Sequence, residues 1–385
     1  MTRATMRSSA IHIPPIRIER GAVDSIQSIV SETGFHHVLI VTGTMRDKIQ
    51  TIYHAIAQCT EVVATIEIHD EPSLPVLEQQ LAAIHHLTID GIIAIGGGSV
   101  LDMAKALSGL MSVKEPITNY LEVVGLGLPL DGEPIPWIAI PTTAGTGSEV
   151  TKNAVIDIPD AQRKVSLRDP RLLPKLALID PALTDQTPKD VTLACGLDAI
   201  TQCIEPYLSK KRTPITDALV RPVIPHALKA LANLMDAESP DNRDMMALAS
   251  VTGGIALANS GLGIVHGFAG PLGSVTGAAH GAICATLLAH GLQSHQLYVQ
   301  DPDLVSRIQN IQQWIADALG GDSRDAFNTL DTWVKAQGIL GLRSLGLEPT
   351  QIPDVALASQ SSSSMKANPV DLDTDILAGI LEDAL

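Results

Sequence analysis

Between Gly91 and Ser99 the chain reads Gly91-Ile92-Ile93-Ala94-Ile95-Gly96-Gly97-Gly98-Ser99. The apolar run from Gly91 to Ile95 is typical of a strand buried on both faces, as in parallel sheets. The three glycines let the backbone approach a ligand closely, and a helical pattern carrying Asp102 and Lys105 follows from Val100 to Met111. Because the free N–H groups of a helix start favour an anion, this stretch predicts a strand, a phosphate-binding turn and a helix.

The chain on either side alternates short β-branched runs with helical patterns, from about Ile16 to Ile179. The predicted elements are strands at His37–Val41, Val62–Ile68 and Trp137–Ile140, and helices at Met45–Ala57 and Pro75–Leu87. Such alternation indicates an α/β fold with a Rossmann-like parallel sheet and helices on both of its faces. Beyond Pro181 to Thr184, long helical patterns dominate. We therefore predict an N-terminal α/β domain over residues 1–185 and an all-α C-terminal domain over residues 186–385.

A second polar stretch follows the predicted strand at 137–140. It reads Pro141-Thr142-Thr143-Ala144-Gly145-Thr146-Gly147-Ser148-Glu149 and supplies four hydroxyl groups and two glycines. Loops at the carboxyl ends of strands in an open parallel sheet form the crevice where ligands of this fold class bind. Two such loops predict a nucleotide site.

No Asp, Glu, Lys or Arg occurs from Met245 to Gln300, in a chain of which 18% of the residues are charged. A segment this uncharged is expected to be buried. It contains four histidines: His266, His280, His290 and His295. A buried histidine is commonly a core imidazole bonded to a backbone carbonyl. Two of them, His266 and His280, have small or apolar neighbours that leave room for a shared ligand or metal, and both interpretations stay open.

A predicted helix from Val191 to Leu208 has an apolar stripe that faces the core: Leu193, Leu197, Ile200, Ile204 and Leu208. Asp198, Gln202 and Glu205 follow one another at spacings of four and three, so they share a different face. This face is either solvated or directed into a cleft. In the second case a carboxylate and an amide oxygen would bind a divalent cation together with His266 and His280.

Composition excludes several classes of protein. The formal net charge of −16 and the pI near 5.1 argue against nucleic acid or an anionic membrane surface as a partner. Four widely spaced cysteines predict free thiols in a reducing compartment: Cys59, Cys195, Cys203 and Cys284. No apolar run precedes Ile11 and none reaches 18 residues, so we expect no secretory signal, no membrane span and a cytoplasmic location.

These motifs resemble those of the iron-containing (group III) alcohol dehydrogenases. Gly96 to Lys105 resembles the family signature GGGSxxDxAK, Pro141 to Glu149 resembles PTTxGTGSE, and Gly261 to Gly281 resembles GLGxxH…H. The match extends from about residue 15 to the C-terminus. It implies a dehydroquinate synthase-like architecture in which the first domain binds NAD(P) and the helical second domain binds the metal and the substrate. It also implies a homodimer formed through the N-terminal strand near Ile16 to Glu19.

The resemblance assigns roles to the matching positions. It implies catalytic and metal-binding roles for Asp198, His266 and His280, with iron or zinc as the metal. The cofactor residues that it implies are Gly97, Gly98, Ser99, Asp102, Thr142, Thr143, Thr146 and Lys164. Gly43 is a further predicted cofactor residue.

Three positions depart from the family pattern. Gln202 stands where the family usually has a histidine ligand, and glutamine would be a weak or outer fourth ligand through its amide oxygen. Gly270 stands where the family often has a histidine near the nicotinamide. Gly43 stands at or next to an aspartate that binds the adenine ribose in many members. Without that carboxylate, and with Arg46 nearby, NADP becomes at least as good a candidate as NAD.

The predicted function is hydride transfer between NAD(P) and a small alcohol or aldehyde by a metal-dependent dehydrogenase, in the crevice between the two domains. One alternative is a metal-free NAD(P)H-dependent reductase on the same scaffold. A second is a lyase of the dehydroquinate-synthase type, which needs basic residues that the uncharged segment does not supply, although Lys210, Lys211 and Arg212 could reach the site from elsewhere. A third is a nucleotide-binding protein without catalytic activity.

Overall fold

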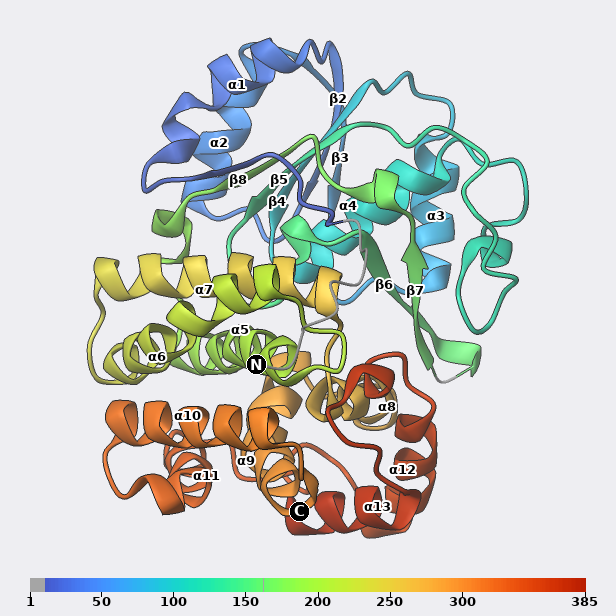
Figure 1. Ribbon diagram of the computed structural model, residues 1–385. Helices are drawn as coiled ribbons and strands as arrows, with labels where there is room; N and C mark the ends of the chain where they lie inside the picture. The colour runs from blue at the N-terminus through green and yellow to red at the C-terminus, as the bar shows by residue number, and fades with distance from the viewer. Residues whose placement is uncertain (1–10, 162) are drawn as a thin grey trace.

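A computed structural model describes residues 11–161 and 163–385 of the chain. A part built on a parallel sheet lies above a part built from stacked helices, and helix α7 (Pro240–Ser260) lies at the junction of the two (Figure 1). The expectation about a secretory signal concerns residues 1–10 and lies outside the described residues.

The main sheet has six strands, all parallel, in the order β1-β8-β5-β4-β2-β3. The strands are β1 (Ile16–Ile18), β2 (His37–Thr42), β3 (Glu61–Glu67), β4 (Gly91–Gly96), β5 (Trp137–Pro141) and β8 (Leu176–Ile179). The predicted parallel sheet is confirmed, and each predicted strand agrees with the observed one to within a residue at either end. The short strand β1 lies at one edge of the sheet.

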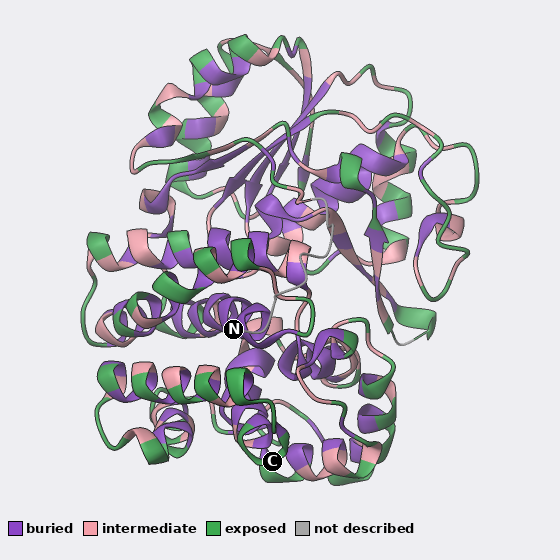
Figure 2. Ribbon diagram, viewed as in Figure 1, coloured by how far each residue is buried: buried purple, intermediate pink, exposed green. Residues whose placement is uncertain are grey.

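Helices cover both faces of this sheet because successive side chains of a parallel strand point in opposite directions. The helices are α1 (Ile26–Thr33), α2 (Asp47–Ala57), α3 (Leu74–Ile84) and α4 (Gly98–Leu110). Ile93 and Ile95 of β4 pack with α1 and α2, whereas Ile92 and Ala94 pack with α3 and α4. The inner strands β2, β4, β5 and β8 are therefore almost completely buried, whereas the edge strands β1 and β3 are partly exposed (Figure 2).

The direction of the strand order reverses at β2. The chain passes from β2 outward to β3 and then returns to β4 on the other side of β2. In open α/β sheets the crevice at such a reversal, beyond the carboxyl ends of the strands, is where ligands bind. Gly43 follows β2 and Gly97 follows β4, so the two predicted cofactor glycines lie at this crevice.

An antiparallel hairpin that the sequence analysis did not predict projects from the sheet part. It consists of β6 (Asn153–Ile158) and β7 (Arg163–Arg168). Its inward residues Ala154, Ile156 and Leu167 join the core beneath α3 and α4. The hairpin extends toward helix α8 (Ile264–Thr276) of the helical part (Figure 1).

Residues 186–385, all of which the structure describes, form only helices and their connections. The α-helices are α5 (Lys189–Leu208), α6 (Pro214–Asp236), α7, α8 (Ile264–Thr276), α9 (His280–Tyr298), α10 (Pro302–Leu319), α11 (Ala326–Ala336), α12 (Ile352–Gln360) and α13 (Thr374–Asp383). This confirms the prediction of a helical second part. The boundary at residue 185 stays a prediction.

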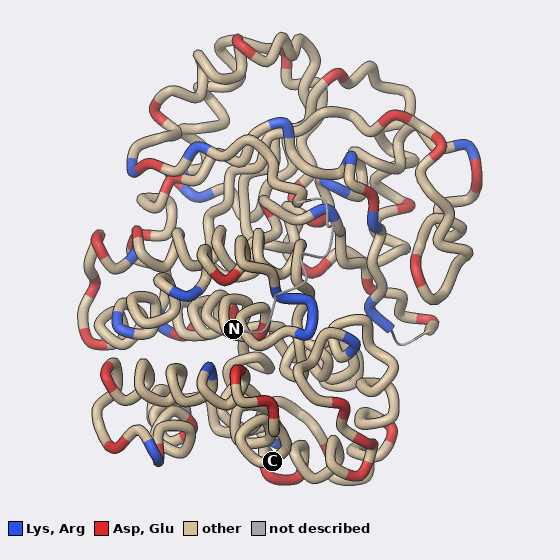
Figure 3. The backbone as a smooth tube through the Cα atoms, in the orientation of Figure 1, with Lys and Arg blue, Asp and Glu red and all other residues tan. Residues whose placement is uncertain are grey.

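The uncharged segment forms most of α7 and all of α8 and α9, and these helices supply much of the core of the helical part. Charged positions are absent from α8 and α9 in Figure 3. Within the described residues, no single helix passes a length and hydropathy test for a membrane span; α7 and α8 pass it only as a pair bent by 97°.

Two glycines let the two parts of the chain meet backbone to backbone. Gly147 follows β5 and has a φ of 60°, and it lies against Gly254 in the middle of α7. A Cβ atom on Gly254 would lie 2.5 Å from the carbonyl oxygen of Gly147 and 2.6 Å from Val150 Cγ2. The loop Pro141–Glu149 is therefore pressed directly onto the helical part.

We predict that Gly254→Ala destabilises the protein by about 1–3 kcal/mol, because the added methyl group overfills a close backbone contact. Gly379→Ala is the matched control, since Gly379 also lies inside a helix but a Cβ there would have no atom within 4 Å. The free energy of unfolding of the control variant is expected to increase by about 0.5–1 kcal/mol, because alanine is favoured over glycine inside a helix. Thermal and denaturant unfolding of both variants measures this, and equal changes in the two would contradict the close contact.

Candidate metal centre and cofactor loops

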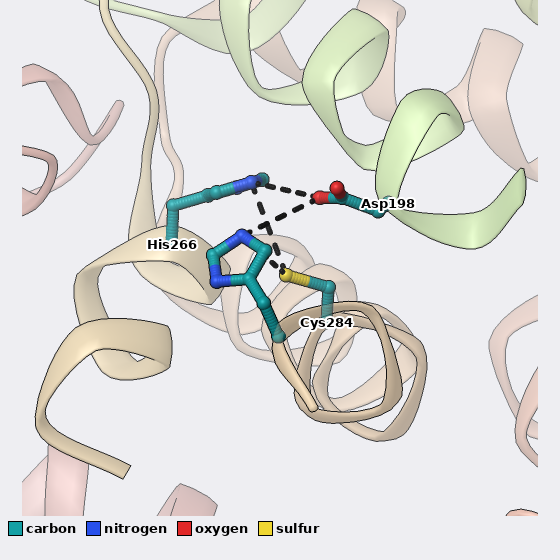
Figure 4. A group of neighbouring side chains, drawn as sticks. Asp198, His266 and Cys284 are labelled. Atoms are coloured by element: carbon teal, nitrogen blue, oxygen red, sulfur yellow. Dashed lines mark hydrogen bonds and ion pairs between the residues drawn. The ribbon is translucent and has the colours of Figure 1, made fainter. Parts of the chain in front are cut away.

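Four potential metal ligands converge from three helices. They are Asp198 of α5, His266 of α8, and His280 and Cys284 of α9, and one ligand atom from each lies within 4.8 Å of all the others. Asp198 Oδ1 is 3.2 Å from His266 Nε2 and 3.6 Å from His280 Nε2. Figure 4 shows Asp198, His266 and Cys284 pointing toward one another. The residues predicted as metal ligands are thus brought together: Asp198, His266 and His280 converge, and Gln202 is buried one turn after Asp198 on α5.

Local helix geometry positions these groups. On α5 the predicted apolar stripe is buried in the core, and the second face that carries Asp198, Gln202 and Glu205 is buried as well. This face is therefore not solvated. His266 lies in the first turn of α8, and His280 begins α9 with Cys284 one turn later, so the last two side chains point the same way.

Glu205 fixes the orientation of His266. One carboxylate oxygen of Glu205 lies 2.7 Å from His266 Nδ1, and the other accepts the backbone N–H of Val265 at 2.7 Å. Because a carboxylate only accepts hydrogen bonds, Nδ1 of His266 carries the proton. The neighbouring Gly263 makes the approach feasible, since a Cβ there would lie 3.0 Å from Glu205 Oε1. The arrangement is the one in which an outer carboxylate orients a histidine ligand of a metal.

The chemistry of this donor set fits a divalent cation. With Nδ1 of His266 protonated, a neutral imidazole presents the lone pair of Nε2 to a carboxylate oxygen only 3.2 Å away. Two acceptors facing each other in a buried site require a positive species, which is either an additional proton or a metal ion. Gln202 Oε1 is also buried there and has no hydrogen-bond partner among the described residues. Carboxylate, imidazole and thiolate groups are ligands of zinc and related transition metals.

The pKa values of the cluster show how strongly its charges interact. Burial opposes protonation of His280, but the charges of Cys284 and Asp198 outweigh it and raise its pKa to about 9. For His266 burial is likewise outweighed, by Cys284 and Glu205, and the pKa rises well above its usual value. Burial would raise the pKa of Asp198, yet the two histidines lower it. Without a metal the cluster therefore binds protons in its place.

Two contributors to the centre were not predicted from the sequence, and the two histidines of the uncharged segment that were not selected as ligands do lie elsewhere. Cys284 was considered only as a buried thiol, although its spacing of four from His280 on a helix was a usable signal. Glu205 was placed on the correct face, but nothing in the sequence paired it with His266. His295 instead bonds Asn368 at 2.9 Å, and His290 lies 3.5 Å from Asp331.

The two predicted cofactor loops lie in direct contact. Thr142 donates its backbone N–H to the carbonyl of Gly96, while a Cβ on Gly97 would lie 3.3 Å from Thr143 Oγ1. On Gly98 a Cβ would be only 2.8 Å from Thr146 Oγ1. Glycine is thus needed for the start of α4 to sit this close to the threonines. Ser99 follows in the first turn of α4, where free N–H groups favour an anion.

Asp102 joins these loops to the hairpin. It accepts hydrogen bonds from Ser148 Oγ at 2.5 Å and from the backbone N–H of Val155 at 3.1 Å. Lys105, completely buried, donates to Asp102, to Ser148 Oγ at 2.6 Å and to Thr151 Oγ1 at 2.9 Å. This buried network holds both loops in fixed positions. Asp102 therefore has a structural task in addition to any contact with a cofactor.

The remaining predicted cofactor residues lie on opposite sides of the crevice. Gly43 donates its backbone N–H to the carbonyl oxygen of Ile95 at 3.4 Å, and Ile95 directly precedes the glycines at 96–98. Lys164 lies on β7, pairs with Glu71, and reaches α8, where a Cβ on Gly273 would be 3.0 Å from its Nζ. Their roles toward a cofactor remain proposals.

The cofactor loops and the metal centre are neighbours. A Cβ on Gly145 would lie 3.0 Å from Cys195 Cβ, and Cys195 precedes Asp198 by one turn of α5. A small pocket at this contact is lined from both parts of the chain, by Thr143 and Ala144 on one side and Cys195 and Gly196 on the other. A ligand held by the loops would therefore lie within reach of the helix that carries Asp198.

Comparison with known protein families gives two matches that together span most of the chain. The family model "Iron-containing alcohol dehydrogenase" matches residues 14–181, and "Fe-containing alcohol dehydrogenase family, C-terminal" matches residues 192–385.

Individual proteins of known name are also similar. Lactaldehyde reductase of Escherichia coli (strain K12) is 35% identical over an alignment of 279 residues that covers 70% of this chain and 71% of that protein. NAD-dependent methanol dehydrogenase of Bacillus methanolicus is 30% identical over an alignment of 393 residues that covers 97% of this chain and 99% of that protein. The crystal structure of 1,3-propanediol oxidoreductase superposes with a TM-score of 0.87 at 26% identity, covering 98% of this chain and all of that one.

We predict that the metal-free protein loses stability as the pH rises from about 6.5 to 9. The pKa of His280 rises from 6.5 to about 9 on folding, so its stabilising contribution is complete below pH 6.5 and is lost as the pH passes 9. Tm measured across this pH range in the presence of a chelator tests the prediction. In the His280→Gln variant the decrease of Tm over the same range should be smaller. A Tm that is constant or increases over the range would contradict it.

Proposed function

The chain belongs to the iron-containing alcohol dehydrogenase family, and we propose that it transfers hydride between a nicotinamide cofactor and a small alcohol or aldehyde at a metal centre. The observation that carries the proposal is the convergence of Asp198, His266 and His280 beside the cofactor loops.

The family assignment confirms three predictions made from the sequence. The resemblance to iron-containing alcohol dehydrogenases is confirmed across nearly the whole chain. So is the enzyme class, an NAD(P)-dependent alcohol dehydrogenase. Members of this family use NAD(H) and iron or a similar divalent metal, in agreement with the predicted cofactors.

In the proposed reaction, Asp198, His266 and His280 hold the metal, and Glu205 keeps Nε2 of His266 directed at it. A metal bound there supplies Lewis-acid chemistry, polarising a carbonyl oxygen or lowering the pKa of an alcohol. The N–H groups at the start of α4 bind the pyrophosphate of the cofactor, and Thr142, Thr143 and Thr146 line its path toward α5. The fixed contact between Gly147 and Gly254 holds these two sets of groups at a constant separation.

The walls of the site favour a small uncharged substrate. Helices α8 and α9 provide no Lys or Arg, so an anionic substrate finds no charged partner on them. Of the three basic residues that could reach the site from elsewhere, Lys210 pairs with Asp371 and Arg212 with Asp303, which leaves Lys211 without an ion pair among the described residues. This argues against the dehydroquinate-synthase type of lyase, which acts on a phosphorylated substrate. The names of the similar proteins, lactaldehyde reductase and methanol dehydrogenase, support short aldehydes and primary alcohols.

The cofactor site supports NADP as well as NAD. Gly43 lacks the carboxylate that would repel a 2'-phosphate, and the exposed Arg46 lies three residues later at the start of α2. The edge position of β1 supports the homodimer that the resemblance implies, because an uncovered edge strand readily pairs with a second chain.

We predict that exhaustive chelation abolishes NAD(P)H oxidation with short aldehydes and that added Zn²⁺ or Fe²⁺ restores it. Asp198→Asn should lower kcat/KM by at least ~100-fold, since it removes the only carboxylate among the proposed ligands while keeping its shape. The assay follows nicotinamide absorbance over a panel of aldehydes, with bound metal measured in parallel. Full activity in metal-free protein would reject the metal role and favour the metal-free reductase.

We predict that Gly43→Asp shifts the preference from NADP toward NAD by about tenfold or more, through repulsion of the 2'-phosphate. The side chain has room, because a Cβ on Gly43 would have no neighbour closer than 3.8 Å. Gly43→Asn is the uncharged control of the same shape. The measurement is kcat/KM with each cofactor, and equal ratios in the Asp and Asn variants would show that charge at residue 43 does not select the cofactor.

A further inference from the structure

We propose that the Cys284 thiolate is a direct ligand of the metal in place of Gln202, giving an Asp-His-His-Cys site that prefers zinc to iron. The substrate oxygen of the proposed function then binds as a fifth ligand. This inference rests on the proposed function, because it concerns the same metal. It adds a ligand from α9 and a metal preference that follows from sulfur.

The position of the sulfur atom matches a shared ion. Cys284 Sγ lies 3.6 Å from His280 Nε2 and 3.8 Å from His266 Nε2. Bonds of about 2.3 Å from zinc to sulfur and about 2.05 Å to nitrogen, at a tetrahedral angle, place the two atoms about 3.6 Å apart. The separations between Asp198 Oδ1 and the same two nitrogens, 3.2 and 3.6 Å, bracket the corresponding value of about 3.3 Å for oxygen and nitrogen.

Two of the three other cysteines show what a structural thiol does in this fold. Cys59 Sγ donates to the carbonyl of Ile56 at 3.2 Å, and Cys203 Sγ donates to the carbonyl of Ala249 at 3.5 Å. Cys284, although completely buried, instead faces two imidazole nitrogens. A single thiol proton can bond only one of them. A cation at the centre satisfies both nitrogens, the carboxylate and the sulfur together.

Gln202 is placed to support the site but is a poor ligand for it. It lies one turn after Asp198 on α5, and its amide helps to lower the pKa of that carboxyl. The neutral amide oxygen is a weaker donor than an imidazole or a thiolate. Gln202 therefore supports Asp198 rather than binding the metal. The fourth ligand comes from α9, as Cys284, and not from α5.

A thiolate changes which metal the site selects. Sulfur is a soft ligand that raises the affinity of a site for zinc and cobalt. The affinity for iron(II), which is commonly bound by oxygen and nitrogen ligands, rises less. We expect the purified protein to retain Zn²⁺ over Fe²⁺ in anaerobic competition. We also expect Cys284→Ser to weaken Zn²⁺ binding by about tenfold or more, while Fe²⁺ binding changes less.

The decisive experiment replaces the metal by Co²⁺ in the full-length protein, because a cobalt–thiolate bond gives a near-ultraviolet charge-transfer absorption that oxygen and nitrogen ligands do not. The wild-type protein should show this band, and Cys284→Ser should lose it while still binding one Co²⁺. Cys203→Ser is the matched control, since Cys203 is an equally buried thiol bonded to a carbonyl, and it should keep the band. Circular dichroism and Tm verify that each variant is folded.

The outcomes separate this inference from the proposed function. If Co²⁺ binds in stoichiometric amount and is lost in Asp198→Asn, but no thiolate band is present in the wild type, the sulfur is not a ligand and the proposed function stands. A band that persists in Cys284→Ser would likewise overturn the assignment. If no metal binds to folded protein, both the ligand set and the metal-dependent function are wrong. If Cys284→Ser does not fold, Cys195→Ser decides: a wild-type band that persists in this variant supports Cys284 as the ligand, and a band that is lost in it overturns the assignment.

Discussion

The hydrogen bond between Glu205 and His266 sets the character of the whole centre. It occupies Nδ1 of the imidazole and so presents Nε2, unprotonated in the neutral ring, to Asp198 at 3.2 Å. That pair is repulsive in a buried site unless something positive lies between the two atoms. His280 and Cys284 lie beside this pair on a third helix. Several groups can therefore bind one cation here, and the site is more than a buried ion pair.

Helix α5 connects this centre to the rest of the molecule. It carries both Asp198 and Glu205, and one turn earlier its Cys195 lies against Gly145 of the cofactor loop. The same loop touches α7 through Gly147. The spacing between the cofactor loops and the metal ligands is thus set by close backbone packing, in which an extra methyl group has no room. Hydride transfer needs such a fixed separation, because reacting atoms must be held within about 3–3.5 Å of each other.

Local sequence pattern predicted those features that depend on neighbours along the chain. The apolar run from Gly91 to Ile95 and the glycines after it defined β4 and the start of α4 because burial on both faces and a tight turn both leave clear residue patterns. The spacing of Asp198, Gln202 and Glu205 placed them on one helix face for the same reason. The hairpin β6–β7 was not predicted, because apolar Val155 stands between Ala154 and Ile156 and interrupts the alternation of apolar and polar residues in β6.

Contacts between distant residues could not be predicted in this way. Asp198 and His266 are 68 positions apart, and Glu205 and His266 are 61 apart. Helical periodicity gives the direction of each side chain but not which helices meet. The resemblance to a known family supplied the pairing of Asp198 with the two histidines. It supplied neither Cys284 nor Glu205, which emerge only when α5, α8 and α9 are placed together.

The central claim is that Asp198, His266 and His280 bind one metal ion that faces the cofactor loops. A crystal structure of the protein with nicotinamide cofactor bound, with anomalous scattering data collected at the metal absorption edge, tests it most directly. The account predicts a single strong anomalous peak within about 2.0–2.2 Å of Asp198 Oδ1, His266 Nε2 and His280 Nε2, with the nicotinamide ring beside it. An anomalous peak at another position would contradict this claim. So would an active crystal in which the three side chains are well ordered but no anomalous peak lies between them.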